Sequence, residues 1–227
     1  MLILAIETAT TICSIAILKD GNVLTEWYVQ SGRTHSTGIM QQLEGVLKRL
    51  NFDKKDVDAV AVDIGPGSFT GLRIGLALGK SLSIGLGIPI VGVSSDAVLA
   101  RAVTVTKGYV AVLIDAQQHN FYYTLYKCND GVVEKIKETE VLDGDNIKVQ
   151  LCNLDEQVIL VGDYDEKIFE GINKLQVLPQ HLRLPRGYNL ALVASELLQD
   201  GLVQSPYNIG LEYLKLSEAE RVWLNKK

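Results

Sequence analysis

The sequence predicts an α/β protein made of two similar lobes, in which mixed β-sheets are flanked by helices. One observation is the alternation of apolar, strand-like runs with helical stretches through residues 1–103. The other is an internal repeat, because two strands and an Asp-Gly turn follow one another in each half. They lie at 2–7, 12–18 and Asp20-Gly21, and again at 110–115, 121–127 and Asp130-Gly131. Duplication of one α/β unit explains both observations.

The elements of the first half follow from their hydrophobic patterns. Apolar runs of strand length predict strands, and apolar residues three or four apart predict helices. In chain order we expect strands at 2–8, 12–18 and 23–29, a helix at 36–50, a strand at 59–63, a helix at 68–86, a strand at 89–93 and a helix at 95–103. This order favours a mixed sheet with helices on its faces.

The second half is less fully interpretable. Beyond the repeated hairpin, a strand is expected at 158–161, a helix at 190–199 and irregular structure at 175–185. Ser217-Glu218-Ala219-Glu220 is a capping box, which predicts the start of a terminal helix. The polar, β-branched stretch at 104–108 suits a joint between domains. We therefore expect an N-terminal lobe at 1–104 and a C-terminal lobe at 105–227, with a terminal helix that can pack back on the first lobe.

Composition and charge disfavour several classes of protein. With 227 residues, of which 47% are hydrophobic, the chain can bury an ordinary core. Its formal net charge of −5 argues against binding nucleic acid alone, which requires a basic surface. The three cysteines lack CxxC spacing, as is typical of reduced thiols, and neither a signal sequence nor a membrane-spanning stretch is recognised. A cytoplasmic protein with no membrane contact is expected.

Residues 63–87 are the most informative stretch of the chain. A strand runs into Gly65-Pro66-Gly67, and a helix begins at Ser68 or Thr70, both of which are good N-caps. Small residues then recur at every fourth position and line one narrow face of this helix: Gly71, Gly75, Gly79 and Ser83. Each interior glycine costs about 1 kcal/mol relative to alanine. We expect this cost to be offset by another helix that approaches closely.

The Gly-Pro-Gly turn has to be compared with phosphate-binding loops. It lacks the Gly-Lys-Ser/Thr ending of a P-loop, and Thr70 stands where a dinucleotide-binding turn has its third glycine. Backbone N–H groups at the start of a helix can still hold an anion. An anion site and a purely structural turn therefore both stay open.

Five segments carry a resemblance to a known family. They are Ile6-Glu7-Thr8-Ala9-Thr10, Arg33-Thr34-His35-Ser36, Gly65-Pro66-Gly67-Ser68-Phe69-Thr70-Gly71-Leu72-Arg73-Ile74-Gly75, Gly92-Val93-Ser94 and Tyr213-Leu214-Lys215. The duplicated hairpin, with Glu7 in one half and Asp115 in the other, resembles the actin-like ATPase superfamily. In their order, the five segments are similar to the TsaB (YeaZ) family. The resemblance implies the actin-like ATPase (ASKHA, RNase H-like) fold in two duplicated lobes.

The resemblance also implies a function in tRNA processing. The chain is expected to be a non-catalytic partner subunit of TsaD, required with TsaD and the small ATPase TsaE for making threonylcarbamoyladenosine beside the anticodon. It further implies a heterodimer with TsaD. A homodimer is expected when TsaD is absent, because the partner face would otherwise expose apolar surface. The net charge of −5 predicts contact with tRNA only through the complex. Three positions depart from the family pattern, because Gln117, Lys215 and Thr34 stand where arginine, arginine and glutamate are usual. Since lysine cannot replace arginine at a bidentate contact, a carboxylate or phosphate contact at Lys215 is weakened.

No enzymatic activity of the chain alone is expected. The resemblance implies that TsaD holds a metal with two histidines on a helix, and Ser95 and Leu99 stand at those positions here. The three histidines, His35, His119 and His181, form no spaced metal motif. No catalytic residue, metal ligand or cofactor is therefore assigned, and weak nucleotide binding stays open.

Two sets of candidate residues follow from the motifs. The partner interface is expected on helices 36–50 and 68–86, at Gly38, Met40, Gly45, Gly71, Ile74, Gly75, Leu78 and Gly79. A vestigial nucleotide site is expected where the resemblance places the acids and phosphate hairpins of actin-like proteins, at Glu7, Thr8, Thr10, Gly65, Gly67 and Asp115. The first hairpin has neither glycine nor lysine to cradle a phosphate. The alternative is that both acids simply cap the ends of strands.

Two other functions remain open. A stand-alone actin-like ATPase or kinase would use the same acids, but it would not need three glycines along a helix away from its cleft. An RNA-binding module is disfavoured by the acidic net charge and by an aromatic content of 7%.

Overall fold

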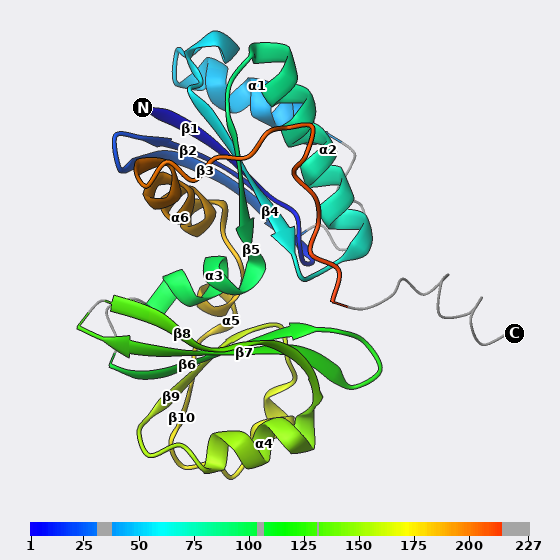
Figure 1. The fold of residues 1–227 in the computed structure, drawn as a ribbon, viewed down its shortest axis with the longest axis vertical. Helices are drawn as coiled ribbons and strands as arrows, with labels where there is room; N and C mark the ends of the chain where they lie inside the picture. Colours follow the sequence, from blue (N-terminus) through cyan, green and yellow to red (C-terminus); the bar gives the residue numbers. More distant parts are fainter. Residues whose placement is uncertain (31–37, 104–106, 131, 215–227) are drawn as a thin grey trace, which may run out of the picture.

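The computed structural model describes residues 1–30, 38–103, 107–130 and 132–214. These residues form two lobes, each of which is built on one five-stranded sheet (Figure 1). None of the helices in this part of the chain is long and apolar enough to cross a membrane.

The first sheet has the strand order β3-β2-β1-β4-β5. Its strands are β1 (Leu2–Glu7), β2 (Ile12–Lys19), β3 (Asn22–Gln30), β4 (Ala59–Gly65) and β5 (Ile90–Ser94). The first three strands pair antiparallel, whereas β4 pairs parallel with both β1 and β5. The sheet is therefore mixed. The carboxyl ends of the parallel strands β1, β4 and β5 lie at the same end of the sheet.

The second sheet repeats this topology strand for strand. Its order is β10-β9-β6-β7-β8, and the strands are β6 (Gly108–Asp115), β7 (Asn120–Asn129), β8 (Val132–Asp143), β9 (Val158–Gly162) and β10 (Leu175–Val177). Here too the first three strands are antiparallel and the last two are parallel additions. The expected architecture, two duplicated lobes with mixed sheets flanked by helices, is confirmed.

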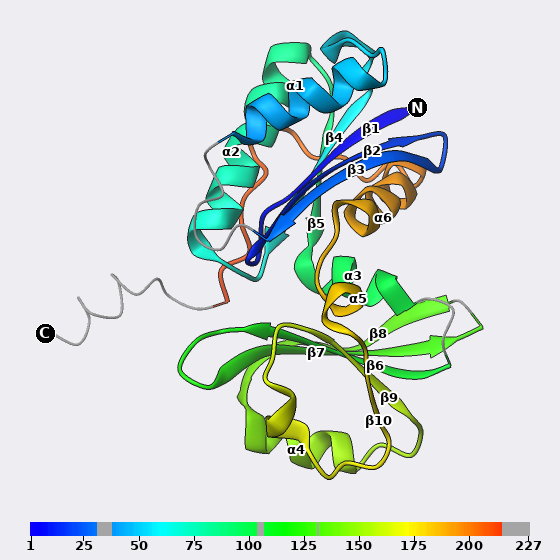
Figure 2. The ribbon, with the colours of Figure 1, turned by 180° about the vertical axis from the view of Figure 1, so that it is seen from behind.

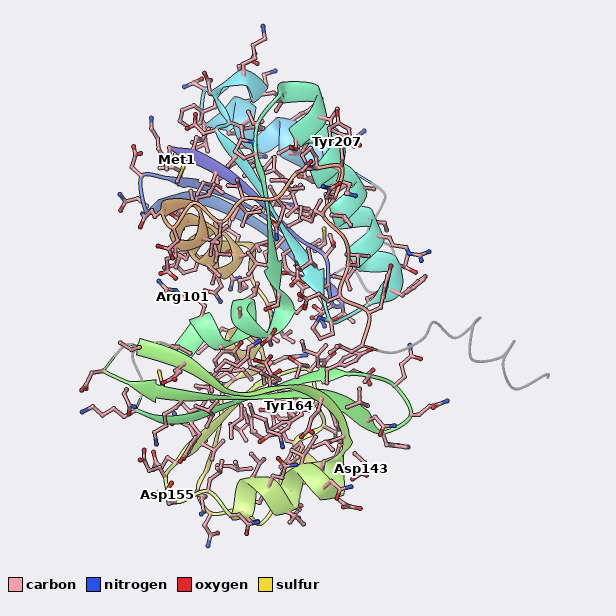
Figure 3. The ribbon with its side chains drawn as sticks, viewed as in Figure 1. Met1, Arg101, Asp143, Asp155, Tyr164 and Tyr207 are labelled. Atoms are coloured by element: carbon pink, nitrogen blue, oxygen red, sulfur yellow. The ribbon has the colours of Figure 1, made fainter. Side chains whose placement is uncertain are left out.

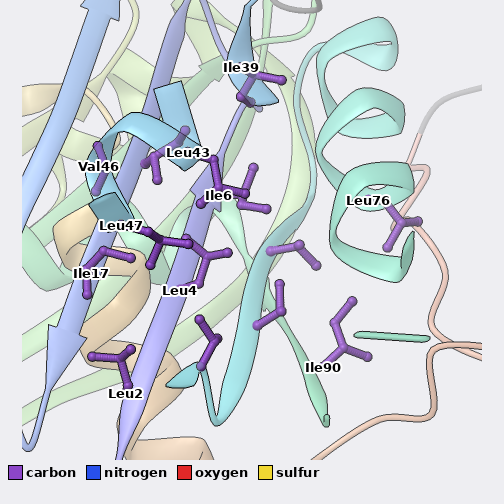
Figure 4. Packing of buried hydrophobic residues seen from close by; sticks show 14 of the residues in the cluster. Leu2, Leu4, Ile6, Ile17, Ile39, Leu43, Val46, Leu47, Leu76 and Ile90 are labelled. Carbon is purple, nitrogen blue, oxygen red and sulfur yellow. The ribbon is translucent and has the colours of Figure 1, made fainter. Parts of the chain in front are cut away.

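Helices cover both faces of the first sheet. One face packs against α1 (Ile39–Arg49) and α2 (Phe69–Leu86) through buried side chains such as Leu43 and Leu76 (Figure 4). The other face packs against α6 (Gly187–Gln199), which contributes Leu190, Ala191 and Ala194. Strand residues alternate between the two clusters, because successive side chains point to opposite faces.

A short helix, α3 (Ser95–Ala100), joins the two lobes. Its Val98 belongs to the apolar cluster of the first lobe, whereas Leu99 and Ala100 belong to a cluster of the second. A 3-10 turn at Arg101–Val103 continues it, so the expected helix at 95–103 is an α-helix only in its first part. The far face of the second sheet is covered by α4 (Gly144–Cys152) and by the 3-10 turn Glu166–Phe169.

The expected lobe boundary is wrong for the end of the chain. After α5 (Gln180–Arg183) the chain returns to the first lobe, where α6 lies on the first sheet and the segment after it runs beside α2 (Figures 1 and 2). Gln204 pairs with the edge strand β5 at Ile90, and the Glu212 N–H donates to the Ile64 carbonyl, 2.8 Å away. The returning segment therefore covers the β5 edge, and residues 187–214 belong to the first lobe.

Some expected elements differ from the structure in detail, and others were not expected at all. The described part of the first helix begins at Ile39 with Gly38 as N-cap, and the expected start at 36 lies outside the described residues. The same holds for the terminal helix expected from Ser217. The strand β8 and the helix α4 were not recognised, and the stretch expected to be irregular contains β10 and α5.

A buried acid ties α3 to the second sheet. Asp96 is 1% exposed and accepts a hydrogen bond from the Tyr126 hydroxyl. It also forms an ion pair with the Lys135 ammonium group, at 2.7 Å. Burial, and then the charge of Asp96, raise the pKa of Tyr126 well above its usual value, so this hydroxyl stays a donor. Because Asp96 lies on the helix between the lobes, these contacts fix one lobe against the other.

Replacing Lys135 by methionine is expected to lower the free energy of unfolding by about 2 kcal/mol, because a buried carboxylate loses its cation. Chemical denaturation followed by circular dichroism measures the change. Lys107→Met is the control, since it removes an ion pair with Asp130 whose side chains are 73% and 78% exposed. Equal stability of the two variants would contradict the role given to Asp96.

Candidate partner surface and closed nucleotide position

The glycine face of α2 points into its own lobe. Gly71, Gly75 and Gly79 are buried, and a Cβ atom on each would come within 2.0 Å of the Thr8 carbonyl oxygen, 2.3 Å of the Thr8 hydroxyl and 2.3 Å of a Val62 methyl group, respectively. The glycines let α2 lie directly on β1 and β4. The prediction that these three residues contact a partner is therefore wrong, because their close neighbour is the sheet of the same chain.

The start of α2 is held by the turn between β1 and β2. The Thr8 hydroxyl donates to the Gly71 carbonyl at 2.8 Å, and the Ser68 N–H donates to the Ala9 carbonyl at 2.6 Å. Ser68 is the N-cap, as expected, and its hydroxyl accepts from the Gly71 N–H at 3.3 Å. Two of the N–H donors at this helix end, those of Ser68 and Gly71, are thus engaged within the chain.

The Gly-Pro-Gly turn is packed in the same way. A Cβ atom at Gly67 would lie 2.4 Å from the Ala9 carbonyl oxygen, and one at Gly65 would lie 3.1 Å from the Glu212 carbonyl oxygen. The Gly65 φ of 105° is also a conformation that favours glycine. These distances leave no room for a side chain at either glycine. Thr8, Gly65 and Gly67 therefore form a tightly packed turn, and the anion site stays a prediction.

The other candidate nucleotide residues lie in different local environments. Thr10 is half-buried and accepts from the Ile12 N–H at 3.2 Å, which closes the β1–β2 turn. Glu7 ends β1 of the first sheet and is completely buried, whereas Asp115 ends β6 of the second sheet and is exposed. Asp115 accepts from the Gln117 N–H at 2.7 Å, within a tight turn. The two acids occupy equivalent strand ends but different environments.

Glu7 instead has Asp63 as its neighbour, a residue that the sequence analysis did not single out. Asp63 is 1% exposed, and its Oδ1 accepts from the Gly65 N–H at 2.8 Å and from the Ser95 hydroxyl at 2.6 Å. Burial, and then the nearby charge of Asp63, raise the pKa of Glu7 well above its usual value; burial also raises the pKa of Asp63. The only sequence signal was an acid at the end of each of two apolar strands.

The two positions compared with the TsaD metal site are both buried. Ser95 is 0% exposed and donates to Asp63, and Leu99 is 1% exposed inside the second apolar cluster. In the described part of the chain, no group of three or more His, Cys, Asp or Glu side chains is placed to hold a metal ion.

The remaining interface candidates lie on the outer side of α1 and α2. Gly38, with a φ of 92°, and Gly45 both have no atom within 4 Å of an added Cβ. Met40 is 40% exposed, and Ile74 and Leu78 are half-buried. Neither helix has an acid in its first turn, and α2 carries only Arg73 and Lys80 as charged residues. This outer side of α1 and α2 is the candidate partner surface.

Two of the family-like segments meet at one end of this surface. The Arg73 guanidinium lies 3.6 Å from the centroid of the Phe69 ring, and its Nε donates to the Tyr213 hydroxyl at 3.1 Å. The rings of Phe69 and Tyr213 are 5.3 Å apart. This contact fastens the returning segment to α2, at the opposite end from exposed Tyr207 (Figure 3). Sequence reasoning had not connected these residues, and Lys215 lies outside the described residues.

Comparison with known proteins places the chain in a family. Residues 29–150 match the family model described as TsaD, tRNA N6-adenosine threonylcarbamoyltransferase. The tRNA threonylcarbamoyladenosine biosynthesis protein TsaB of Escherichia coli is 33% identical over 165 residues, which cover 71% of each chain. Its counterpart from Bacillus subtilis is 28% identical over 235 residues, covering 100% of both chains.

A solved structure agrees with these relatives. YeaZ from Pseudomonas aeruginosa superimposes with a TM-score of 0.80 at 26% identity, covering 94% of this chain and 99% of the other. The TsaB protein of Buchnera aphidicola from Schizaphis graminum is 33% identical over 74% of this chain and 80% of its own length. The similarity thus extends over both lobes, and the chain belongs to the TsaB family.

Proposed function

We propose that this chain is the non-catalytic partner subunit of TsaD in the biosynthesis of threonylcarbamoyladenosine beside the tRNA anticodon. The observation that carries the proposal is its membership of a family whose curated relatives are named for this biosynthesis. The match of residues 29–150 to a TsaD model supports the pairing, because related chains can associate through equivalent surfaces.

The candidate partner surface supports this role physically. Gly45 leaves open space on α1, and the two helices carry exposed apolar side chains, with Met40 of α1 at 40% and Ile84 of α2 at 47% exposure. Small residues and exposed apolar groups on the same pair of helices suit close packing by a second pair of helices. The surface is assigned to TsaD, and to a second copy of this chain when TsaD is absent. TsaE and tRNA are reached through that complex, in keeping with the net charge of −5.

The packing of the β1–β2 turn on α2 argues against the stand-alone ATPase alternative. An ATPase of this fold needs room for phosphates at the strand ends of the first lobe. Here the Ala9 and Thr8 carbonyl oxygens face Gly67 and Gly71, so the β1–β2 turn is closed against the start of α2. The chain is therefore assigned a supporting role, while transfer of the threonylcarbamoyl group is assigned to TsaD.

Reconstitution of tRNA modification tests the proposal. TsaD and TsaE from the same organism are mixed with tRNA, ATP and threonylcarbamoyl adenylate, with or without this chain, and the modified nucleoside is measured by mass spectrometry. Modification is expected only when the chain is present. The chain without TsaD is expected to give none. Equal modification rates with and without the chain would overturn the proposed function.

A further inference from the structure

Glu7 and Asp63 lie side by side on two adjacent parallel strands, Glu7 at the end of β1 and Asp63 two residues before the end of β4. In the β1–β4 register Ile6 is paired with Val62, so the next residues on both strands, Glu7 and Asp63, are also neighbours. Side chains at matching positions of neighbouring parallel strands point to the same face. Glu7 is 0% exposed and Asp63 is 1% exposed. Two carboxyl groups are thus enclosed together away from water.

Only one oxygen of each carboxyl group has a hydrogen-bond partner in the protein. Glu7 Oε1 accepts from the Ala9 N–H at 2.7 Å, and Asp63 Oδ1 accepts from the Gly65 N–H and from Ser95. Glu7 Oε2 and Asp63 Oδ2 are buried, and neither has a hydrogen-bond partner in the protein. A buried acceptor without a donor is costly, and two buried like charges are more costly still. A positive charge between these two oxygens would remove both costs.

The surrounding groups do not supply a cation. From β2, the nearby group is the Cys13 thiol, whose pKa burial raises to about 11, so that it is uncharged near neutral pH. From α3, the nearby charge is Asp96, which is another acid and is already paired with Lys135 of β8. Among the described residues, no lysine or arginine contributes to the electrostatics of Glu7. The pair must take its positive charge from solution.

We propose that Glu7 and Asp63 form a binding site for a single proton, held between Glu7 Oε2 and Asp63 Oδ2 at neutral pH. Glu7 carries the proton and donates a hydrogen bond through it to Asp63. The pair therefore bears one negative charge, on Asp63, which the Gly65 N–H and the Ser95 hydroxyl stabilise. No bond other than this hydrogen bond forms. The site is independent of the partner role proposed above.

The shared proton has a structural function at the start of α2. The residues that follow Glu7 form the turn that is hydrogen-bonded to Ser68 and Gly71 of α2. The residues that follow Asp63 form the turn around Gly65. Joining the two carboxyl groups joins these two turns. Loss of the proton would place two negative charges between β1 and β4 and loosen the start of α2.

The direction of the pH dependence follows from the raised pKa values. In the unfolded chain both acids release their protons near pH 4, whereas in the folded chain one proton is retained to higher pH. The folded state therefore binds more protons above pH 4, and stability decreases as pH rises. Relative to a variant without the proton, the folding equilibrium constant should fall at least about tenfold between pH 5 and pH 8.

Amide variants of the full chain test the proposal. Glu7→Gln replaces the protonated acid by an amide whose N–H can donate to Asp63, and Asp63→Asn is its counterpart. Each single variant is expected to fold and to lose the pH dependence, measured by denaturation at pH 5 and pH 8. The double variant places two amides against each other and is expected to be less stable than either single variant.

Infrared spectroscopy of the wild-type chain gives a second, direct measurement. A band of a buried protonated carboxyl group is expected at pH 7, and it should disappear in Glu7→Gln. Absence of the band at pH 7 would overturn the proposal. So would stabilisation of the wild type, but not of Glu7→Gln, by added Na⁺, K⁺, Mg²⁺ or Ca²⁺, since the occupant would then be a cation.

Discussion

Gly71→Ala is expected to lower the free energy of unfolding by about 3 kcal/mol or more. The added Cβ would lie 2.0 Å from the Thr8 carbonyl oxygen and 3.2 Å from its carbon. These are backbone atoms of the β1–β2 turn, so they cannot move aside as a flexible side chain would, and α2 would have to shift off the sheet. Denaturant unfolding, followed by far-ultraviolet circular dichroism, measures the loss.

The same helix offers a matched control. Gly85 also lies in α2, but no atom is within 4 Å of an added Cβ there. Gly85→Ala is expected to raise stability by about 0.5–1 kcal/mol, because alanine is the better helix former. Opposite signs for the two variants support the packing of α2 on the sheet. Similar effects of both substitutions would contradict it.

Gly45→Trp is expected to weaken the complex with TsaD about 100-fold, which corresponds to about 2.7 kcal/mol. The side chain would enter open space on α1, so the isolated chain should keep its fold and melting temperature. In the complex it would stand between helices that approach over a glycine, where overpacking is costly. Isothermal titration calorimetry with TsaD measures the affinity.

A tryptophan elsewhere on the surface controls for nonspecific effects. Val149 on α4 is 61% exposed and lies on the second lobe, away from the candidate partner surface. Val149→Trp is expected to leave TsaD affinity unchanged. Unchanged affinity in Gly45→Trp, or an equal loss in both variants, would show that α1 is not at the interface.

The fold was largely predictable because its strands are short apolar runs and its two halves repeat. What the sequence could not indicate was which sheet an amphipathic helix would cover. The apolar spacing of α6 predicts a buried face but not the sheet that it covers, and the path of the returning chain places it on the first sheet. The strand β8 was missed because charged residues alternate along it, with Lys135 and Lys137 half-buried between exposed glutamates. The helix α4 buries only Ile147 and Leu151, which is a weak apolar pattern.

The candidate sites, too, were predictable only in part. The spacing of Gly71, Gly75 and Gly79 correctly predicted one closely approached face, but periodicity identifies a face and not its neighbour. A sheet of the same chain and a helix of another chain both require small residues. The pairing of Glu7 with Asp63 depends on parallel contact between β1 and β4, which are separated by two strands and a helix in the sequence. Nothing in the local pattern around either acid indicates that contact.

The measurement that tests the partner role most directly is the mass of a mixture of this chain with TsaD from the same organism, determined by light scattering after size exclusion. The account predicts a single species with the summed mass of one copy of each chain, replaced by separate species when Gly45→Trp is used. Two unassociated proteins in the wild-type mixture, at concentrations well above micromolar, would contradict it.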